Sequence, residues 1–275
     1  MKVLLTSGGT RAKIDDVRHV GNMSSGTFGK HICNAFLKKG HDVTFLYAKG
    51  SKCPHELRID LQSILDFSCA NSVSNHVYYS DLINGLRKKV SQDAFDLYLH
   101  REKYHPIAYD DFEDYSTKLA ECLKDLPEIV VLAAAASDYL PVKVEGKISS
   151  EMNDMTINMV KAPKLIRGVR GVLPDCFLVG FKLLVGSTEL ELIDAMGDQI
   201  RKANTDMVVG NDLRDIRNSA HKLTIISIDH HPCELGPGPG EKLAEDLVFE
   251  IVRDAETMLG EYDHLGAVGR RPRRA

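Results

Sequence analysis

The residues best suited to binding an anionic ligand lie in segment 6–29, which reads TSGGTRAKIDDVRHVGNMSSGTFG. Backbone N–H groups of residues 7–10 can bind one anion, and those of the SSG sequence at 24–26 can bind another where a helix is expected to begin. Connections in compact domains have a median length of about 4 to 6 residues, so this irregular, much longer connection favours a ligand-binding loop. The segment predicts a site for two anionic groups; the alternative is a surface loop whose glycines only permit turns.

A second group of residues suits a polyphosphate. Lysines occur at Lys147 in GKISS and at Lys161 and Lys164 in KAPK, and lysines beside a ligand crevice neutralise the charges of a triphosphate. The buried run 128–137, EIVVLAAAAS, ends in small residues that leave room for a flat or phosphorylated ligand. Asp138 follows it where open α/β sheets bind their ligands, although an Asp at this place can equally cap a turn.

Short apolar runs alternate with amphipathic segments along the chain, which predicts an α/β fold with a mostly parallel sheet. We expect strands at 1–5, 43–47, 128–137, 155–160, 176–184, 206–210 and 222–228, the last in a small antiparallel hairpin with 232–235. We expect helices at 28–39, capped by Gly40, and at 112–123, 163–172, 188–203 and 241–259. Pro163 is expected in the first turn of its helix. The first strand, helix and second strand form a right-handed βαβ unit.

Length and composition favour one domain. The chain has 275 residues, 43% of them hydrophobic, and no apolar run long enough for a membrane span. We expect a single domain at 1–260, with an insertion at 51–111 over the sheet edge and a basic, disordered tail at 261–275. The first strand begins without a secretory signal, so we expect a cytoplasmic protein.

Cysteine spacing and net charge exclude several classes of function. The six cysteines form no CxxC pair, which argues against a disulfide framework and a structural zinc site. His230, His231 and Cys233 are more simply explained as turn residues than as metal ligands, and any metal ligands stay unknown. The net charge is −4 and the dense basic cluster lies in the tail, so nucleic-acid binding is not expected.

The motifs TSGGT, IDDVRHVGNMSSG, LAAAASDY, KISS, MVKAPK, GFKLL and GND follow one another over residues 1–215. In this order they resemble the phosphopantothenoylcysteine synthetase family, also called phosphopantothenate–cysteine ligases, in its stand-alone form. The resemblance implies a Rossmann-like fold, usually dimeric. It also implies a ligase of coenzyme A biosynthesis that joins 4'-phosphopantothenate to L-cysteine through an acyl-nucleotidylate, releasing pyrophosphate and a nucleoside monophosphate. By the same resemblance, the strand from Lys222 and its hairpin are the expected dimer interface.

The resemblance also assigns roles to residues. Asn22 matches the asparagine at the phosphopantothenate carboxylate, where an amide donor stabilises charge developing on the acyl group, and Lys147 matches a catalytic lysine on the triphosphate. Nucleotide-binding positions are matched by Ala133, Ala134, Asp138, Lys147, Val160, Lys161, Ala162, Pro163 and Phe181, while Lys202 matches one of an expected lysine pair whose partner falls near Gln199. The two proposed anion sites add Gly8, Gly9, Ser24, Ser25 and Gly26 as substrate-binding residues.

The nucleotide is ATP or CTP, with Mg²⁺ to screen the repulsion between the carboxylate and the phosphates. The sequence GFKLLV, in place of the bacterial GFAAET, and the insertion at 51–111 resemble the eukaryotic type and favour ATP. One alternative, suggested by the SGGT loop, is a short-chain NAD(P)-dependent reductase. It would need a Tyr-x-x-x-Lys pair, and an acidic residue where Tyr47 to Gly50 read YAKG. A non-catalytic nucleotide sensor also stays open.

Overall fold

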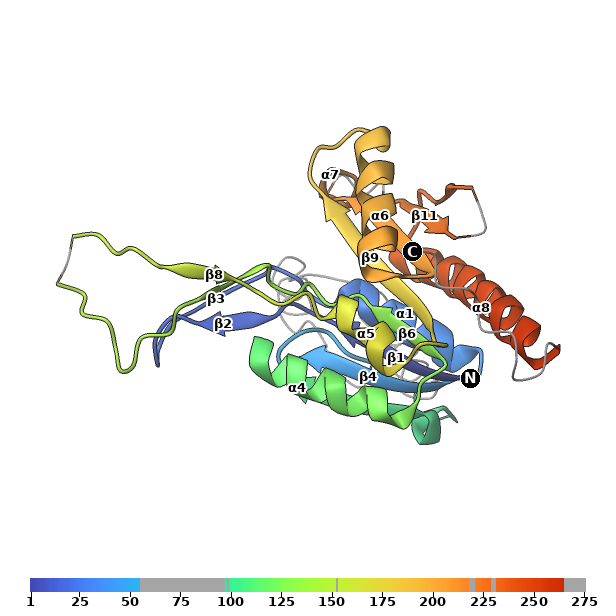
Figure 1. Cartoon of the computed structure of the whole chain (residues 1–275), viewed down its shortest axis with the longest axis horizontal. Coiled ribbons are helices and arrows are strands. Elements are labelled where there is room, and N and C mark those ends of the chain that lie inside the picture. The colour runs from blue at the N-terminus through green and yellow to red at the C-terminus, as the bar shows by residue number, and fades with distance from the viewer. Residues whose placement is uncertain (55–96, 98, 152, 218–220, 229–230, 265–275) are drawn as a thin grey trace, which may run out of the picture.

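An eight-stranded sheet forms the centre of the structure (Figure 1). This computed structural model describes residues 1–54, 97, 99–151, 153–217, 221–228 and 231–264. The strands lie in the order β12-β11-β10-β9-β6-β1-β4-β5. Their bounds are Lys2–Ser7 for β1, Asp42–Ala48 for β4, Tyr104–Tyr109 for β5, Ile129–Leu132 for β6, Phe177–Leu184 for β9, Met207–Asp212 for β10, Leu223–Ser227 for β11 and Cys233–Leu235 for β12.

The strands from β10 to β5 run parallel, whereas β11 pairs antiparallel with both β10 and β12. The predicted α/β class, with a mostly parallel sheet and a small antiparallel hairpin, is confirmed. The parallel pairing of β1 with β4 around α1 also confirms the predicted βαβ unit. The carboxyl ends of the parallel strands therefore meet at one edge of the sheet, where open α/β sheets bind ligands.

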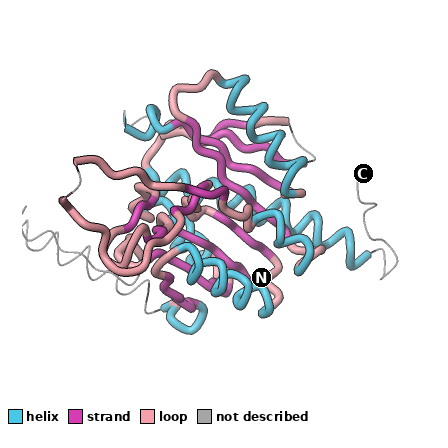
Figure 2. Tube along the Cα trace, turned by 60° about the vertical axis from the view of Figure 1, so that its left-hand side comes forward, coloured by secondary structure: helices cyan, strands magenta, loops and turns pink. Residues whose placement is uncertain are grey.

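Helices cover both faces of the sheet (Figure 2). Their bounds are Thr27–Lys38 for α1, Phe112–Cys122 for α4, Ile166–Val172 for α5, Glu189–Ala203 for α6, Leu213–Arg217 for α7 and Gly240–His264 for α8. Alternate residues of a strand point to opposite faces. Leu5 accordingly packs in a cluster with α1 and α8, while Leu4 packs in a second cluster with α4 and α5. Burial on both faces explains why β1 reads as a continuous apolar run.

Local capping signals define several helix ends. Thr188 and Glu191 form a capping box at the start of α6, because the Thr188 hydroxyl accepts from the Glu191 amide while the Glu191 carboxylate accepts from the Thr188 amide. The C-cap of α1 is Lys39, one residue before the predicted Gly40, and Gly40 follows it with φ +83°, the left-handed conformation usual just after a C-cap. The prediction for Pro163 was wrong, because α5 begins only at Ile166.

Two antiparallel ribbons project from the sheet edge (Figure 1). One pairs β2 (Arg11–Lys13) with β3 (His19–Gly21), and the other pairs β7 (Tyr139–Pro141) with β8 (Met159–Lys161). The ribbons lie against each other, with the Val144 amide donating to the Ile14 carbonyl at 2.9 Å. We call the described residues of 10–22 and 138–161 the arm.

The arm differs from two expectations. Segment 6–29 is not an irregular loop, because its middle forms the β2–β3 hairpin. The strand expected at 155–160 is also displaced, since β8 comprises only Met159–Lys161. The β2–β3 pairing is local, but the hairpin is also bonded to Val144, and β8 pairs with β7.

Two boundaries also shift. The range 51–111 ends in β5, which is an edge strand of the central sheet, and its residues 55–96 and 98 lie outside the described part. Helix α8 continues to His264, past the expected start of the tail, and residues 265–275 are not described. The single domain at 1–260 stays a prediction. Within the described residues, no helix combines the length and the apolar character needed to cross a bilayer.

Candidate functional site

The loops that follow β1 and β6 meet at the carboxyl edge of the sheet. The Ala135 amide donates to the Gly8 carbonyl at 2.8 Å, and the Thr10 amide donates to the Ala135 carbonyl at 3.1 Å. These two hydrogen bonds extend the parallel pairing of β1 and β6 beyond the ends of the strands. The two predicted ligand loops therefore form one surface.

Asn22 lies at this junction. Its backbone amide donates to the Thr10 carbonyl at 3.2 Å, and its side-chain Nδ2 donates to the Ala135 carbonyl at 3.1 Å. The Asn22 side chain is exposed, so the amide group is held in place by the backbone and is accessible from solvent. A methyl group on Gly9 would come within 2.2 Å of the Asn22 carbonyl oxygen, which explains why glycine is needed at position 9.

A cavity of about 200 Å³ opens beside Asn22. Its lining is mostly polar and includes three basic side chains. The lining residues are Gly9, Arg11, His19, Gly21, Asn22, Ser24, Ala48, Lys49, Gly50 and Ser51. The structure thus brings the predicted Gly9, Asn22 and Ser24 together around a space large enough for part of a small anionic ligand.

The other predicted members of this loop, Gly8, Ser25 and Gly26, lie next to the lining residues without lining the cavity themselves. Gly8 has φ +85°, and a methyl group on it would lie 2.7 Å from the Cβ of Ala48. Gly26, with φ +73°, is the N-cap of α1, and a methyl group on it would lie 2.9 Å from the Cβ of Ser51. The Ser25 hydroxyl lies 2.8 Å from the Thr27 hydroxyl, where the free amides of the helix end attract an anion.

Sequence reasoning missed the three basic residues of the cavity. Arg11 and His19 lie on the β2–β3 ribbon, and Lys49 lies in the turn after β4. The alternation of Arg11, Ala12, Lys13 and Ile14, with only the apolar members buried, is a strand signal that could have revealed the ribbon. Lys49 also pairs with Asp110, at 3.4 Å.

Several predicted nucleotide-binding residues gather next to this junction. Ala133 and Ala134 are half-buried just after β6, and the Ala134 amide donates to Thr6 Oγ1 at 3.1 Å. Asp138 and Ala162 stand where the arm leaves and rejoins the core, and the Ala162 amide donates to the Asp138 carbonyl at 2.8 Å.

Two aromatic side chains and one ion pair border the same region. Phe181 of β9 packs edge-to-face against Phe28 at the start of α1, with ring centroids 6.5 Å apart. The Asp138 carboxylate forms an ion pair with Lys164. Pro163 lies in the connection between β8 and α5, and Val160 and Lys161 are exposed on β8.

Lys147 lies apart from these residues within one chain. It is exposed on the arm, beside the turn of the β2–β3 hairpin, where the Asp16 amide donates to the Gly146 carbonyl at 3.0 Å. Extended chain rises roughly 3.3 Å per residue, which places this turn on the order of 20 Å from Thr10.

Lys202 lies elsewhere again. It is in the last turn of α6, and α6 connects the carboxyl end of β9 with the start of β10. Lys202 therefore lies at the opposite edge of the sheet, where it pairs with Asp198. Gln199, near which the partner of Lys202 was expected, faces the sheet instead. A methyl group on Gly180 of β9 would come within 2.1 Å of the Gln199 amide nitrogen.

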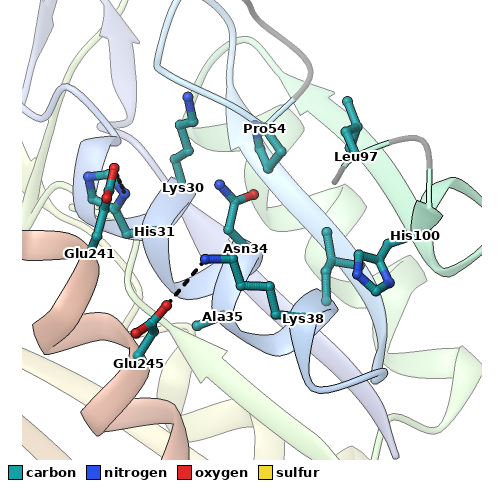
Figure 3. Close-up of a pocket in the computed structure, with 11 residues that line it drawn as sticks. Lys30, His31, Asn34, Ala35, Lys38, Pro54, Leu97, His100, Glu241 and Glu245 are labelled. Atoms are coloured by element: carbon teal, nitrogen blue, oxygen red, sulfur yellow. Dashed lines mark hydrogen bonds and ion pairs between the residues drawn. The ribbon is translucent and has the colours of Figure 1, made fainter. Parts of the chain in front are cut away.

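A second, smaller cavity of about 90 Å³ lies between α1 and α8 (Figure 3). Its lining residues are Lys30, His31, Asn34, Ala35, Leu37, Lys38, Pro54, Leu97, His100, Glu241 and Glu245. Lys38 and Glu245 form an ion pair across it at 3.2 Å. None of these residues belongs to the predicted site.

Sequence comparison identifies relatives of this chain. The family model for the DNA/pantothenate metabolism flavoprotein C-terminal domain matches residues 1–77 and 112–254. A coenzyme A biosynthesis bifunctional protein of Thermococcus kodakarensis is 29% identical over 251 residues, which is 91% of this chain and 50% of the relative. A human phosphopantothenate–cysteine ligase is 31% identical over 201 residues, 66% of this chain and 63% of the relative.

A structural relative has the same fold. The DNA/pantothenate metabolism flavoprotein from Streptococcus pneumoniae superposes with a TM-score of 0.68 and 23% identity, over 92% of this chain and 99% of that one. The chain spans about half the length of the bifunctional relatives that it matches. Since the family model covers well over half of the chain, the protein belongs to the DNA/pantothenate metabolism flavoprotein C-terminal domain family.

Proposed function

We propose that this protein is a phosphopantothenate–cysteine ligase of coenzyme A biosynthesis, forming 4'-phosphopantothenoylcysteine. The observation that carries the proposal is the Asn22 amide, bound to the Ala135 carbonyl at the mouth of a basic cavity. Family membership supports it, as do the names of the human and plant relatives, which are phosphopantothenate–cysteine ligases.

In the proposed complex the cavity holds the phosphate end of phosphopantothenate. Arg11, His19 and Lys49 offer N–H donors, and the start of α1 adds backbone amides. The pantothenate chain then extends along the junction and brings its carboxylate to Asn22. An anionic substrate fits this lining better than a neutral one, because three basic side chains share one small space.

The reaction proceeds in two steps. A carboxylate oxygen attacks the α-phosphorus of the nucleotide, the bond between the α-phosphate and the bridging oxygen breaks, and pyrophosphate leaves. The cysteine amine then attacks the acyl carbon, loses a proton, and expels the nucleoside monophosphate. The Asn22 side chain donates to the acyl oxygen as charge develops there, and holding both reactants at the junction makes each step effectively unimolecular.

The nucleotide is proposed to bind where Ala133, Ala134, Asp138 and Phe181 border the same edge. The small alanine side chains leave space beside the backbone, and Phe181 supplies an apolar surface. We favour ATP over CTP.

We take Mg²⁺ as a counter-ion of the nucleotide, since protein-bound Mg²⁺ is commonly held by substrate phosphates and one or two carboxylates. Asp138 is exposed next to this edge and fits that role. When bound, Mg²⁺ would neutralise phosphate charge. Lys202 is not part of the proposed site.

A homodimer is part of the proposal. Apolar side chains stay uncovered along the arm, among them Val17 at 65%, Tyr139 at 55% and Val160 at 54% exposure. A second copy would cover these residues and bring Lys147 of one copy to the nucleotide edge of the other. These exposed apolar side chains favour the arm as the dimer interface, in place of the hairpin from Lys222 that we expected from the sequence. Sedimentation velocity should then give a dimer, and replacing Val17 and Tyr139 by Asp should give monomers.

We also propose a cytoplasmic location. Among the described cysteines, Cys33, Cys122 and Cys176 are buried free thiols, as is usual in a reducing compartment. Burial raises the pKa of Cys122 and Cys176 to about 11, so these thiols stay protonated. Fractionation of cells that express the untagged protein would test the location.

The decisive experiment mixes purified protein with phosphopantothenate, cysteine, Mg²⁺ and either ATP or CTP, and measures pyrophosphate. Release that requires phosphopantothenate is expected. Nucleotide binding without pyrophosphate from either nucleotide would contradict the ligase proposal and favour a sensor.

Asn22→Ala tests the proposed acyl contact. It should retain the fold and slow turnover by about 100-fold, the range seen when one such donor is removed. Lys13→Gln is the control, because Lys13 lies on the same ribbon but pairs with Asp111 at 3.5 Å. Wild-type turnover in the Asn22 variant would remove the proposed role of its amide.

A further inference from the structure

The arm contains one buried carboxylate among exposed residues. The Asp15 side chain has 0% exposure, whereas apolar neighbours such as Val17 and Val144 keep 65% and 47%. Burial of an ionised group is costly unless every oxygen is paired. The position of Asp15 in the hairpin turn therefore requires an explanation in terms of its contacts.

Each of the two carboxylate oxygens of Asp15 accepts two hydrogen bonds. Oδ1 accepts from the amides of Val17 at 2.8 Å and Arg18 at 2.6 Å. Oδ2 accepts from the amide of Ile148 at 3.1 Å and from Nη1 of Arg18 at 2.9 Å. Burial acts to raise the pKa of Asp15, but the amides of Val17, Ile148 and Arg18 and the Arg18 charge outweigh it and lower the pKa, so the group is ionised at neutral pH.

Hydrogen bonds from Asp15, Asp16 and Arg18 join the hairpin turn to the residues on either side of Lys147. On one side, the Gly146 amide donates to Asp16 Oδ2 at 3.0 Å and the Gly146 carbonyl accepts from the Asp16 amide at 3.0 Å. On the other side, the Ile148 amide binds Asp15 and the Ile148 carbonyl accepts from Arg18 at 3.2 Å. The backbone of Lys147 is thus held at both neighbours, while its side chain is exposed.

We propose that Asp15 is a positioning residue, which fixes the backbone at Lys147 so that the ammonium group is presented to the nucleotide triphosphate. This inference rests on the proposed ligase function and on the proposed dimer, in which Lys147 of one copy reaches the nucleotide edge of the other. Among the described residues, the hydrogen bonds of the Asp15 side chain all lie within the arm, away from the cavity beside Asn22. Its effect on the reaction must therefore pass through Lys147.

The number of N–H donors around position 15 requires a carboxylate there, because an amide cannot accept from all of them. Four N–H groups converge on two oxygens, and an ionised carboxylate can accept all four. In Asp15→Asn, one of the two oxygens becomes an NH₂ group that faces donors. Whichever way the amide turns, two N–H groups lose their acceptor, although the side chain keeps its shape.

The test combines exchange and kinetics on the full chain. Amide hydrogen exchange at Ile148 should be about tenfold or more faster in Asp15→Ala, which removes both oxygens and leaves the Ile148 amide without its acceptor. Exchange at Gly146, on the other side of Lys147, should rise with it because the segment loses its anchor. Exchange in the core strands should be unchanged. Asp154→Asn is the control, because Asp154 is an exposed acid on the same arm. Unchanged exchange at Gly146 and Ile148 would overturn the proposal.

A double-mutant cycle separates positioning from general stability. Asp15→Asn should raise the nucleotide KM or lower kcat about tenfold with Lys147 present, and should have no further effect in Lys147→Ala. Full additivity of the two changes would overturn the positioning role. If Asp15→Asn does not fold, Arg18→Gln replaces it, because it removes the donor shared by Asp15 Oδ2 and the Ile148 carbonyl.

The failure of each proposal gives a different result. A wild-type protein that releases no pyrophosphate with either nucleotide contradicts the ligase function, and the catalytic part of the Asp15 proposal falls with it. In that case, faster exchange at Gly146 and Ile148 in the Asp15 variant would still show that Asp15 orders the Lys147 segment. If the wild type is active and exchange at Gly146 and Ile148 is unchanged in the Asp15 variant, the Asp15 proposal is wrong and the ligase proposal is unaffected.

Discussion

Arg170 of α5 should hold the starts of β9 and β10 together. Its guanidinium pairs with the Asp206 carboxylate, and Nη1 and Nε donate to the carbonyls of Cys176 at 2.5 Å and Asn204 at 2.7 Å. Asp206 Oδ2 also accepts from the Leu178 amide at 2.7 Å. The side chains of Arg170 and Asp206 are only 15% and 12% exposed, so this is a largely buried ion pair.

Arg170→Met keeps most of the aliphatic stem and removes the charge. Breaking a buried pair from one side costs about 3–5 kcal/mol, because the Asp206 carboxylate would stay buried and lose its guanidinium partner. Slight exposure of the pair places the expected loss near 3 kcal/mol. The double variant Arg170→Met, Asp206→Asn should recover part of this loss, since no uncompensated charge remains and an amide oxygen can still accept from Leu178.

Urea unfolding followed by circular dichroism measures the effect. With a slope of about 3 kcal/mol per M, a loss of 3 kcal/mol moves the midpoint down by about 1 M. Arg167→Met is the matched control on the same helix, where an exposed side chain should change stability by about 0.5 kcal/mol or less. A loss under about 1 kcal/mol for Arg170→Met, or no recovery in the double variant, would refute the reasoning.

Three further variants test the site and its surroundings. Gly8→Ala should lower the free energy of unfolding by more than about 1 kcal/mol, because φ is +85° and the new methyl group would lie 2.7 Å from a neighbouring side chain. Gly168→Ala, in open space on a helix, should raise it by up to about 1 kcal/mol. Equal melting temperatures for the two variants would contradict this. Burial lowers the pKa of His221 below 6.5, so its contribution to stability is full above pH 6.5 and falls as the pH drops, when the unfolded chain binds the proton first. His221→Asn should therefore lose less melting temperature than the wild type between pH 7.5 and pH 5.5, and an identical loss would exclude this contribution. Arg11→Gln should raise the KM for phosphopantothenate about tenfold with little change in kcat, as expected for lost ground-state binding, while Lys13→Gln should not; a fall in kcat alone would argue against phosphate binding.

Local signals were sufficient to predict most elements of the core. Strand β1 is recognisable because buried parallel strands are apolar on both faces, and α6 because its Thr188 cap precedes an amphipathic run. The same is true of Gly40, whose positive φ follows from its place after α1. Each of these signals depends on residues close together in sequence.

Predictions failed where a segment is also held by residues distant in sequence. The β2–β3 hairpin was treated as an irregular loop, although it is stabilised by contacts such as that between Asp16 and Gly146, 130 residues away. The start of α5 was placed at Pro163, but the chain from Ala162 first has to complete the base of the arm by bonding to Asp138. No local pattern contains these pairings.

The sequence by itself determined the family of this protein, the class of its sheet and the identity of residues such as Asn22, because motif order and apolar periodicity are properties of the chain alone. Tertiary structure decided which of these residues meet. It placed Asn22 on the Ala135 carbonyl beside an unforeseen basic cavity, and it set Lys147 out on the arm and Lys202 at the far edge of the sheet. The reason is physical: the distance between two side chains follows from strand order and from hydrogen bonds between segments far apart in sequence, and neither is encoded in the spacing of residues along the chain.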